Sequence, residues 1–163
     1  MKPYTTSHHF HDKAQGYAEL AKTLAALLSG ERDRIANAAN TAAVIYDALP
    51  ELNWAGFYFL KSGELVVGPF QGKPACVRIA VGRGVCGEAA ARRATLIVRN
   101  VHAFPGHIPC DSASNSELVV PLLKGDTVLG VLDLDSPQFS RFDEVDASGL
   151  EEIARIFVNA SDW

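Results

Sequence analysis

Apolar residues recur every three or four positions along the first 49 residues, and this spacing predicts two amphipathic helices ahead of any strand. The first helix is expected within residues 11–28, just before Gly30. Its apolar positions are Tyr17, Leu20, Leu24, Leu27 and Leu28. The second helix is expected within residues 31–49, because Pro50 cannot continue a helix. Its apolar positions are Ile35, Ala39, Ala42, Ile45 and Leu49.

Beyond Pro50 the pattern changes to aromatic and β-branched runs separated by turn residues, which predicts strands. The expected strands are residues 53–60, 64–70, 76–81, 95–100, 117–123 and 127–134. The first two should form a hairpin across Ser62 and Gly63, and the last two should form another hairpin. A short Ala-rich helix is expected at residues 84–94. Residues 101–115 form the longest irregular stretch, and such loops are often functional.

A final helix is expected to begin at Asp143, with Glu144 and Asp146 in its first turn, where acidic side chains are favourable. Its apolar face is expected to comprise Val145, Leu150, Ile153, Phe157 and Val158. This order of elements predicts an α+β fold, in which the N- and C-terminal helices pack on a mostly antiparallel sheet. We expect a single domain over residues 1–163, with residues 1–12 loosely ordered.

Composition limits the possible classes of function more than it limits the possible folds. The 163 residues are 48% hydrophobic and 21% charged, as in ordinary globular proteins, and the formal net charge is −4. A net negative chain gives no electrostatic case for binding nucleic acid. No apolar run is long enough to span a bilayer, and the first residues lack the apolar core of a signal peptide. The expected location is therefore the cytoplasm, where thiols are kept reduced.

Three cysteines lie within residues 76–110, and an odd number fits a static disulfide framework poorly. Cys86, in the Ala-rich helix, fits burial as a small hydrophobic residue. Cys76 begins an expected strand after a proline, which suggests an accessible edge. Cys110 follows Pro109 in the polar loop, where solvent and substrate should reach its thiol. Nearby His107 or backbone amides would be needed to give this thiol thiolate character.

Two carboxylates alternate with leucines in the last expected strand. By the period of two, Asp133 and Asp135 share one face, and Leu132 and Leu134 share the other. If Glu117 on the paired strand faces them, three acids converge and raise one another's pKa. Such a cluster can bind an ammonium group and donate a proton, although a solvated sheet face is the simpler alternative.

Two other motifs are weaker. The run from Gly82 to Gly87 reads GxGxxG, but the acidic residue and the repeated βαβ units of dinucleotide-binding domains are missing, so a tight turn is favoured. A zinc site is conceivable at two places, although neither has a typical ligand spacing, and we expect no metal. The candidate ligands are His8, His9 and His11 near the N-terminus, or His102 and His107 with Cys110.

Four segments together resemble the GAF-domain free methionine-(R)-sulfoxide reductases, and the similarity extends from about residue 15 to 160. These segments are Asn53–Tyr58, Gly84–Ala90, Cys110–Glu117 and Gly130–Ser136. The run Cys-Asp-Ser-Ala-Ser-Asn-Ser-Glu, with two more cysteines upstream, is the most specific of them. The resemblance implies a GAF fold and reduction of the free R epimer of methionine sulfoxide without a cofactor.

The resemblance also implies roles for individual residues. Cys110 would attack the sulfoxide sulfur and become a sulfenic acid, Cys76 would condense with it, and thioredoxin would reduce the disulfide. Cys86 matches a lesser recycling partner. The substrate-binding residues would be Glu117, Asp133, Asp135, Trp54 and Tyr58. A protein of oxidative stress defence is expected, and the apolar faces of its N-terminal helices are compatible with a homodimer. The rival interpretation is a non-enzymatic GAF sensor of a small ligand or of redox state.

Overall fold

The computed structural model describes residues 12–163, so the N-terminal histidine cluster and the expectation for residues 1–11 lie outside the described part. Four α-helices, one 3₁₀ turn and six strands follow one another in the predicted order. The helices are α1 (Lys13–Leu27), α2 (Arg34–Ala48), α3 (Gly84–Arg92) and α4 (Glu144–Ala160), with the 3₁₀ turn at Val101–Ala103. The strands are β1 (Trp54–Lys61), β2 (Glu64–Gly72), β3 (Arg78–Ala80), β4 (Leu96–Val98), β5 (Ser116–Lys124) and β6 (Thr127–Ser136).

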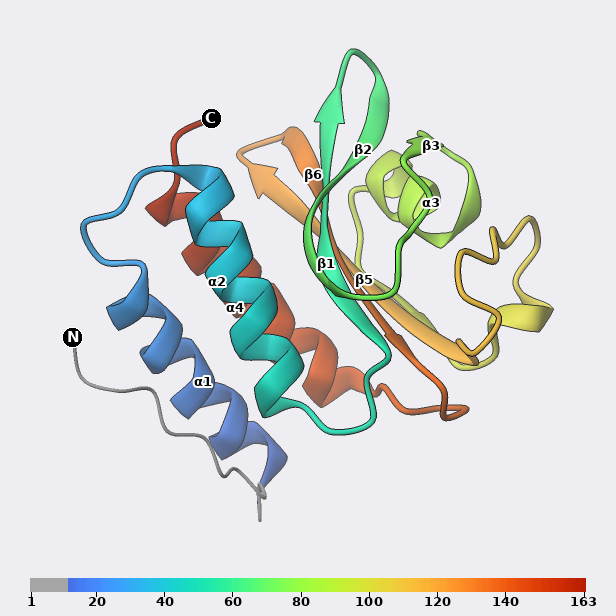
Figure 1. The fold of residues 1–163 in the computed structure, drawn as a ribbon, viewed down its shortest axis with the longest axis horizontal. Coiled ribbons are helices and arrows are strands. Elements are labelled where there is room, and N and C mark those ends of the chain that lie inside the picture. The colour runs from blue at the N-terminus through green and yellow to red at the C-terminus, as the bar shows by residue number, and fades with distance from the viewer. Residues whose placement is uncertain (1–11) are drawn as a thin grey trace.

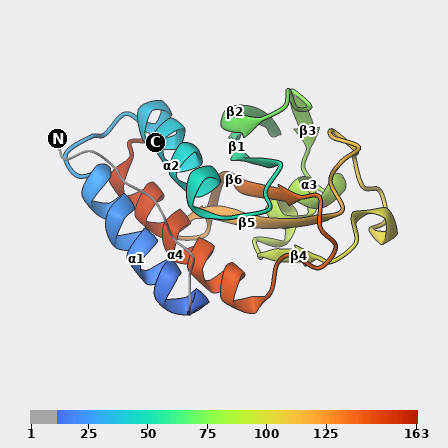
Figure 2. The same ribbon diagram turned by 60° about the horizontal axis from the view of Figure 1, so that its bottom comes forward.

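The strands form one antiparallel sheet in the order β3-β2-β1-β6-β5-β4, with helices on both faces. Helices α1, α2 and α4 cover one face, and α3 lies on the other (Figures 1 and 2). The predicted α+β fold is therefore confirmed. None of the helices in residues 12–163 is long and apolar enough to cross a membrane.

The period of two in β6 separates two cores. Leu132 and Leu134 are fully buried in the larger core under α1, α2 and α4. Val131 lies in the smaller core under α3, and Asp133 follows it on the same face. The face assignment made from the sequence is confirmed, and it puts the acids on the side of the sheet that carries α3.

The helices themselves were predicted correctly, but some of their apolar positions do not face the core. Leu27, Ile35, Ala39 and Val145 are exposed. In α2 the buried face includes Asn37 instead, because its Nδ2 donates to the carbonyl of Glu31 and to Ser161 Oγ (both 3.1 Å). A polar side chain with tertiary partners thus takes a place that periodicity alone assigns to an apolar one.

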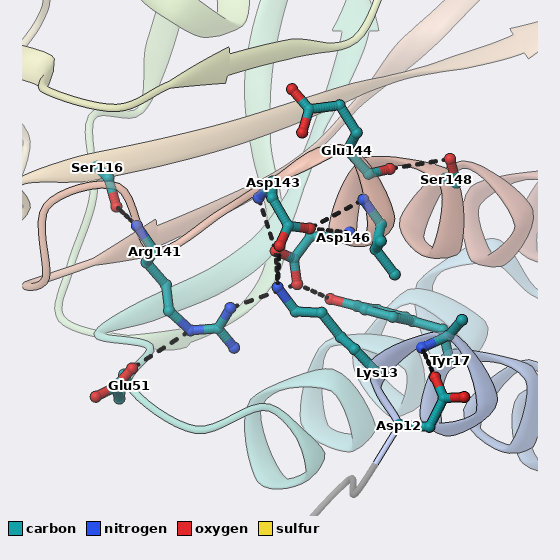
Figure 3. Close-up of polar contacts among 12 residues, drawn as sticks. Asp12, Lys13, Tyr17, Glu51, Ser116, Arg141, Asp143, Glu144, Asp146 and Ser148 are labelled. Carbon is teal, nitrogen blue, oxygen red and sulfur yellow. Dashed lines mark hydrogen bonds and ion pairs between the residues drawn. The ribbon is translucent and has the colours of Figure 1, made fainter.

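A buried carboxylate fastens α1 to α4 (Figure 3). Asp146 is fully buried, and its Oδ2 lies 2.6 Å from Lys13 Nζ, while its Oδ1 accepts a hydrogen bond of 2.8 Å from the Tyr17 hydroxyl. Its Oδ2 also accepts from the backbone N–H of Asp143, which completes a capping box at the start of α4. Arg141 Nη1 approaches Asp146 Oδ1 at 3.4 Å. Asp146 therefore connects α1 to the start of α4 and to the residues just before it, two segments that are far apart in the sequence.

The Asp146→Ala substitution is expected to lower the free energy of unfolding by about 3–5 kcal/mol, because it leaves Lys13, Tyr17 and Arg141 without their shared partner. Urea denaturation at neutral pH measures this. Glu144→Ala, two residues away in the same first turn and with a side chain that is 80% exposed, is the control and should change stability by no more than about 0.5 kcal/mol. Equal losses in the two variants would contradict the role given to Asp146.

Candidate functional site

A pocket that is open to solvent lies on the α3 side of the sheet. Its floor comes from β1, β5 and β6, and its walls come from the start of α3 and from two irregular segments, residues 73–76 and 107–114. Seven of the eight residues that the sequence analysis gave to the site line it: Trp54, Tyr58, Cys86, Cys110, Glu117, Asp133 and Asp135. The eighth, Cys76, does not line the pocket and is joined to Cys110 by a disulfide.

The three acids come together through strand pairing. Glu117 on β5 is paired with Asp135 on β6, and Asp133 precedes Asp135 by two residues on the same face. Glu117 and Asp133 are each only 6% exposed, and Asp135 is half-buried. The convergence expected from the sequence is thus present. The solvated alternative does not hold for Glu117 and Asp133.

Burial gives these acids unusual proton affinities. Removal from water raises the pKa of Asp133 to about 7. Burial, and then the neighbouring charges of Asp133 and Asp135, raise the pKa of Glu117 well above its usual range. The pKa of Asp135 is raised in the same way, first by burial and then by Asp133. At neutral pH the pocket therefore keeps protons on carboxyl groups, and it can donate them to a bound ligand.

The cysteines divide into a bonded pair and a buried thiol. Cys76 and Cys110 form a disulfide, with their Cα atoms 5.7 Å apart, and Cys110 is exposed as expected. Cys86 is a free, buried thiol whose Sγ lies 3.9 Å from Glu117 Oε1. Burial, followed by the charges of Asp133 and Glu117, raises the pKa of Cys86, so this thiol stays protonated. The burial expected for Cys86 is present, but its partners are acids of the pocket.

The two pocket aromatics also hold the segment that carries Cys76. Trp54 Nε1 donates a hydrogen bond of 3.2 Å to the carbonyl of Lys73, and the Tyr58 hydroxyl donates one of 3.1 Å to the carbonyl of Cys76. Trp54 stacks on Tyr58, with ring centroids 5.8 Å apart. The rings thus line the pocket and fix the backbone on one side of the disulfide.

The segment that carries Cys110 is fixed by groups to which the sequence analysis gave no role. Asn53 Nδ2 donates to Asp111 Oδ2 (3.2 Å) and to Ser114 Oγ (2.9 Å). Asp111 also accepts the N–H of Ala113, a bond that lowers the pKa of this carboxyl. An aspartate that accepts an N–H two residues ahead is a common turn motif, and the sequence Asp-Ser-Ala was the available signal. Lys73 Nζ, 3.6 Å from Asp111 Oδ1, links the two irregular segments.

His107 does not lie beside a free thiolate, because Cys110 is in the disulfide. Its Nε2 lies 3.7 Å from Glu117 Oε2, and burial lowers the pKa of its imidazole, which is therefore mostly neutral at pH 7. Within residues 12–163, the group whose ligand atoms gather closely enough for a metal ion is Cys86, Glu117 and Asp133, all within 4.8 Å of one another. This group differs from the histidine sites considered from the sequence. Its thiol is protonated and the pKa values of its carboxyl groups are raised, so these groups favour binding protons over binding a cation.

The GxGxxG run forms a tight turn, as favoured from the sequence. Gly82 and Gly84 have positive φ angles of 84° and 62°, and Gly82 N–H bonds to the carbonyl of Gly87 (2.8 Å). A Cβ on Gly87 would overlap the carbonyl oxygen of Ala80. The glycines thus serve close backbone packing at the start of α3.

Comparison with known proteins agrees with this geometry. A model of the GAF domain family matches residues 36–160. Free methionine-R-sulfoxide reductase of Escherichia coli is 51% identical over 142 residues, which is 87% of this chain and 86% of that protein. The enzyme of the same name from Saccharomyces cerevisiae is 40% identical, covering 89% and 85%. The structure of free methionine-R-sulfoxide reductase from Neisseria meningitidis with its substrate is 44% identical, with a TM-score of 0.92 and coverages of 97% and 95%.

The Asp133→Asn variant is expected to be more stable than the wild type by about 1–3 kcal/mol above pH 7 and equal to it near pH 4. The cause is that the pKa of Asp133 is raised to about 7 in the folded protein. At low pH the Asp133 carboxyl is protonated in both the folded and the unfolded wild type. The wild type therefore loses stability as the pH rises from the pKa of Asp133 in the unfolded chain to its pKa in the folded protein. Urea denaturation across this pH range measures the difference. Asp126→Asn, on an exposed turn, is the control, and a pH-independent difference for Asp133→Asn would contradict the argument.

Proposed function

We propose a reaction for this pocket on the premise that the chain belongs to the GAF-domain family of free methionine-R-sulfoxide reductases. The protein reduces free L-methionine-(R)-sulfoxide to methionine, with Cys110 as nucleophile and Cys76 as the thiol that condenses with it. The observation that carries the proposal is the Cys76–Cys110 disulfide in the wall of a pocket whose floor holds three acids with raised pKa values.

The chemistry balances with groups that are present. In the reduced protein the Cys110 thiolate attacks the sulfoxide sulfur, and a protonated carboxyl of the cluster supplies the proton that lets oxygen leave from sulfur. Water then adds to Cys110 Sγ as the bond between Sγ and the substrate sulfur breaks, which releases methionine and leaves Cys110 as a sulfenic acid. The Cys76 thiol then forms the disulfide with Cys110, and the oxygen leaves as water. The two electrons given to the sulfoxide come from the two thiols.

Substrate choice follows from charge and shape. The free amino acid carries an ammonium group that peptide-bound methionine lacks, and the acids of β5 and β6 are its natural partners. Leaving such buried carboxylates without a partner costs several kcal/mol, in order of magnitude, so a ligand without the ammonium binds poorly. Trp54 offers an aromatic face to the S-methyl group, a contact that contributes about 0.3–1.5 kcal/mol.

A dithiol protein such as thioredoxin restores the two thiols in this proposal, in the reducing cytoplasm. Cys110 is an exposed residue, which favours attack by an external thiolate, since access is one requirement of thiol–disulfide exchange. Cys86 is less suited to the exchange, because it is buried and its pKa is raised. In the proposal, Cys86 keeps a protonated thiol beside Glu117 in the pocket.

The proposal is tested with the purified protein, thioredoxin, thioredoxin reductase and NADPH. NADPH oxidation is expected with free L-methionine-(R)-sulfoxide and is expected to be absent with the S epimer and with a peptide-bound sulfoxide. Silence with all three substrates, from folded and reduced protein, would instead favour a GAF module that senses a small ligand.

The Cys110→Ser variant should lose all turnover in this assay and keep its fold. Cys76→Ser should release about one methionine per protein and then stall, because the sulfenic acid has no efficient partner. Ser112→Ala, an exposed change in the loop of Cys110, is the control and should turn over normally. Repeated turnover by Cys110→Ser would remove the assignment of the nucleophile, and unimpaired cycling by Cys76→Ser would remove that of the recycling thiol.

A homodimer is also proposed. Ile35, Ala39, Ala43 and Tyr46 lie along one exposed side of α2 at helical spacing, and Ile35 is 48% exposed. An apolar stripe of this kind is typical of a surface that a second copy covers. Sedimentation analysis should give a dimer for the wild type and a monomer for Ile35→Lys, with Asn40→Lys on the neighbouring side of α2 as control. A monomeric wild type at micromolar concentration would contradict the proposal.

A further inference from the structure

Exposed apolar residues lie beside the disulfide on both of the segments that it joins. Three of them are within two residues of Cys76 or Cys110 in the sequence, and we call them the apolar collar. They are Pro74, Val77 and Pro109. Val77 is 62% exposed, and no large hydrophobic residue within residues 12–163 is more exposed. A lone apolar residue on a surface is ordinary, whereas several beside one reactive bond indicate a surface that another molecule covers.

The backbone that carries Val77 is held by the neighbouring strands. The carbonyl of Val77 accepts a hydrogen bond of 3.0 Å from the N–H of Val67 on β2. The carbonyl of Cys76 accepts one of 3.1 Å from the Tyr58 hydroxyl on β1. Beyond Val77 the chain enters β3, which forms one edge of the sheet (Figure 1). A side chain on a fixed backbone loses little freedom when a partner covers it, so Val77 is suited to anchor a second protein.

Positive charge accompanies the collar. Three cations and no carboxylate occur in residues 73–83, in a chain whose formal net charge is −4. The cations are Lys73, Arg78 and Arg83. Lys73 pairs with Asp111 and Arg78 pairs with Glu64, and in both pairs the side chain of the cation is more exposed than that of the acid. The surface beside the disulfide therefore presents cations, which steer a partner that carries carboxylates.

A partner that reduces this disulfide has to bring a thiolate to one of its sulfur atoms and then leave. Transient redox complexes bury little surface, below about 1,200 Å² in total, so a few apolar residues with charges around them suffice. A protein that covers the collar has to present apolar side chains around its own reactive thiol, and carboxylates further out to face the cations. A small thiol makes use of neither feature.

We propose that the apolar collar is the docking surface for the dithiol protein that reduces the disulfide, with Val77 as its anchor and Arg78 on its charged rim. The inference deepens the proposed function and rests on it. One thiolate of the docked protein attacks a sulfur of the disulfide, and the electron pair of the broken bond passes to the other sulfur. The second thiol of the partner then attacks the mixed disulfide. The partner leaves oxidised, and Cys76 and Cys110 are both left reduced.

The test compares two reductants of the oxidised protein, namely reduced thioredoxin and the small uncharged dithiol dithiothreitol. Alkylation of the free thiols followed by mass spectrometry gives the rate of reduction. Val77→Ser should lower the second-order rate constant with thioredoxin about five- to thirtyfold and leave that with dithiothreitol within about twofold. Val77→Ile keeps an apolar side chain and should retain the wild-type rate with thioredoxin within about twofold.

Arg78→Gln tests the charged rim. The rate constant with thioredoxin should fall with added salt in the wild type, because salt screens the attraction. Arg78→Gln should lower it about two- to fivefold at low salt and make it less dependent on salt. Arg155→Gln is the matched control, since Arg155 is similarly exposed, also pairs with a glutamate and lies on α4. Equal losses in Arg78→Gln and Arg155→Gln would overturn the role given to the rim.

Val145→Ser, an exposed valine on α4, is the matched control for the anchor and should keep the wild-type rates with both reductants. An unchanged rate with thioredoxin in Val77→Ser would overturn the inference. A rate that falls equally with both reductants would overturn it as well, because the substitution would then act on the disulfide itself. A change of oligomeric state in Val77→Ser, measured by sedimentation, would make the collar a contact between copies of this chain and would also overturn it.

This experiment separates the inference from the proposed reaction, because it uses no sulfoxide. A loss with thioredoxin alone in Val77→Ser supports the docking surface even if the wild type reduces no sulfoxide. Reduction of free L-methionine-(R)-sulfoxide with dithiothreitol, by a protein whose disulfide thioredoxin does not reduce, would overturn the docking surface and leave the reaction standing.

Discussion

The site depends on the register between β5 and β6. Because successive side chains of a strand point to opposite faces, a slip of one residue would turn Asp133 and Asp135 into the larger core and bring Leu132 and Leu134 into the pocket. The leucines are fully buried under the helices, so the hydrophobic energy of the large core fixes the position of the acids on the other face. Packing on one side of the sheet thereby holds the chemistry on the other.

Holding the acids in this way costs stability. Asp133 and Glu117 are removed from water with raised pKa values, and a carboxylate pays for its burial unless a partner compensates it. Substitution by an amide would relieve this cost, and it would also remove a transferable proton. The fold can bear the cost because stability comes from elsewhere: the large core, and the buried Asp146 that joins α1 to α4 (Figure 3). Within residues 12–163, the carboxyl groups whose pKa is clearly raised, those of Glu117, Asp133 and Asp135, all line the pocket.

Patterns within a strand could be predicted from the sequence, whereas contacts between distant segments could not. The alternation around Asp133 predicted which side chains of β6 share a face of the sheet, because the period of two is a property of the strand backbone. No spacing rule brings Cys76 to Cys110, 34 residues away, and their pairing was implied by family resemblance alone. Periodicity assigned Ile35 to the core. The hydrogen bond from Asn37 to Ser161, just after α4, instead helps to decide which side of α2 is buried.

The placement of the cysteines explains how one of them can react while the scaffold stays intact. Cys76 and Cys110 both lie in irregular segments, outside every strand and helix, so their bond can form and break without disturbing a hydrogen-bonded ladder. Trp54 and Tyr58 hold one segment through backbone carbonyls, and Asn53 holds the other through Asp111, so neither anchor uses a sulfur atom. Both segments therefore keep their anchors when the thiols are reduced, and the two sulfur atoms stay within reach of each other. Cys86 has no such freedom on α3, where moving it would also move the amino end of the helix.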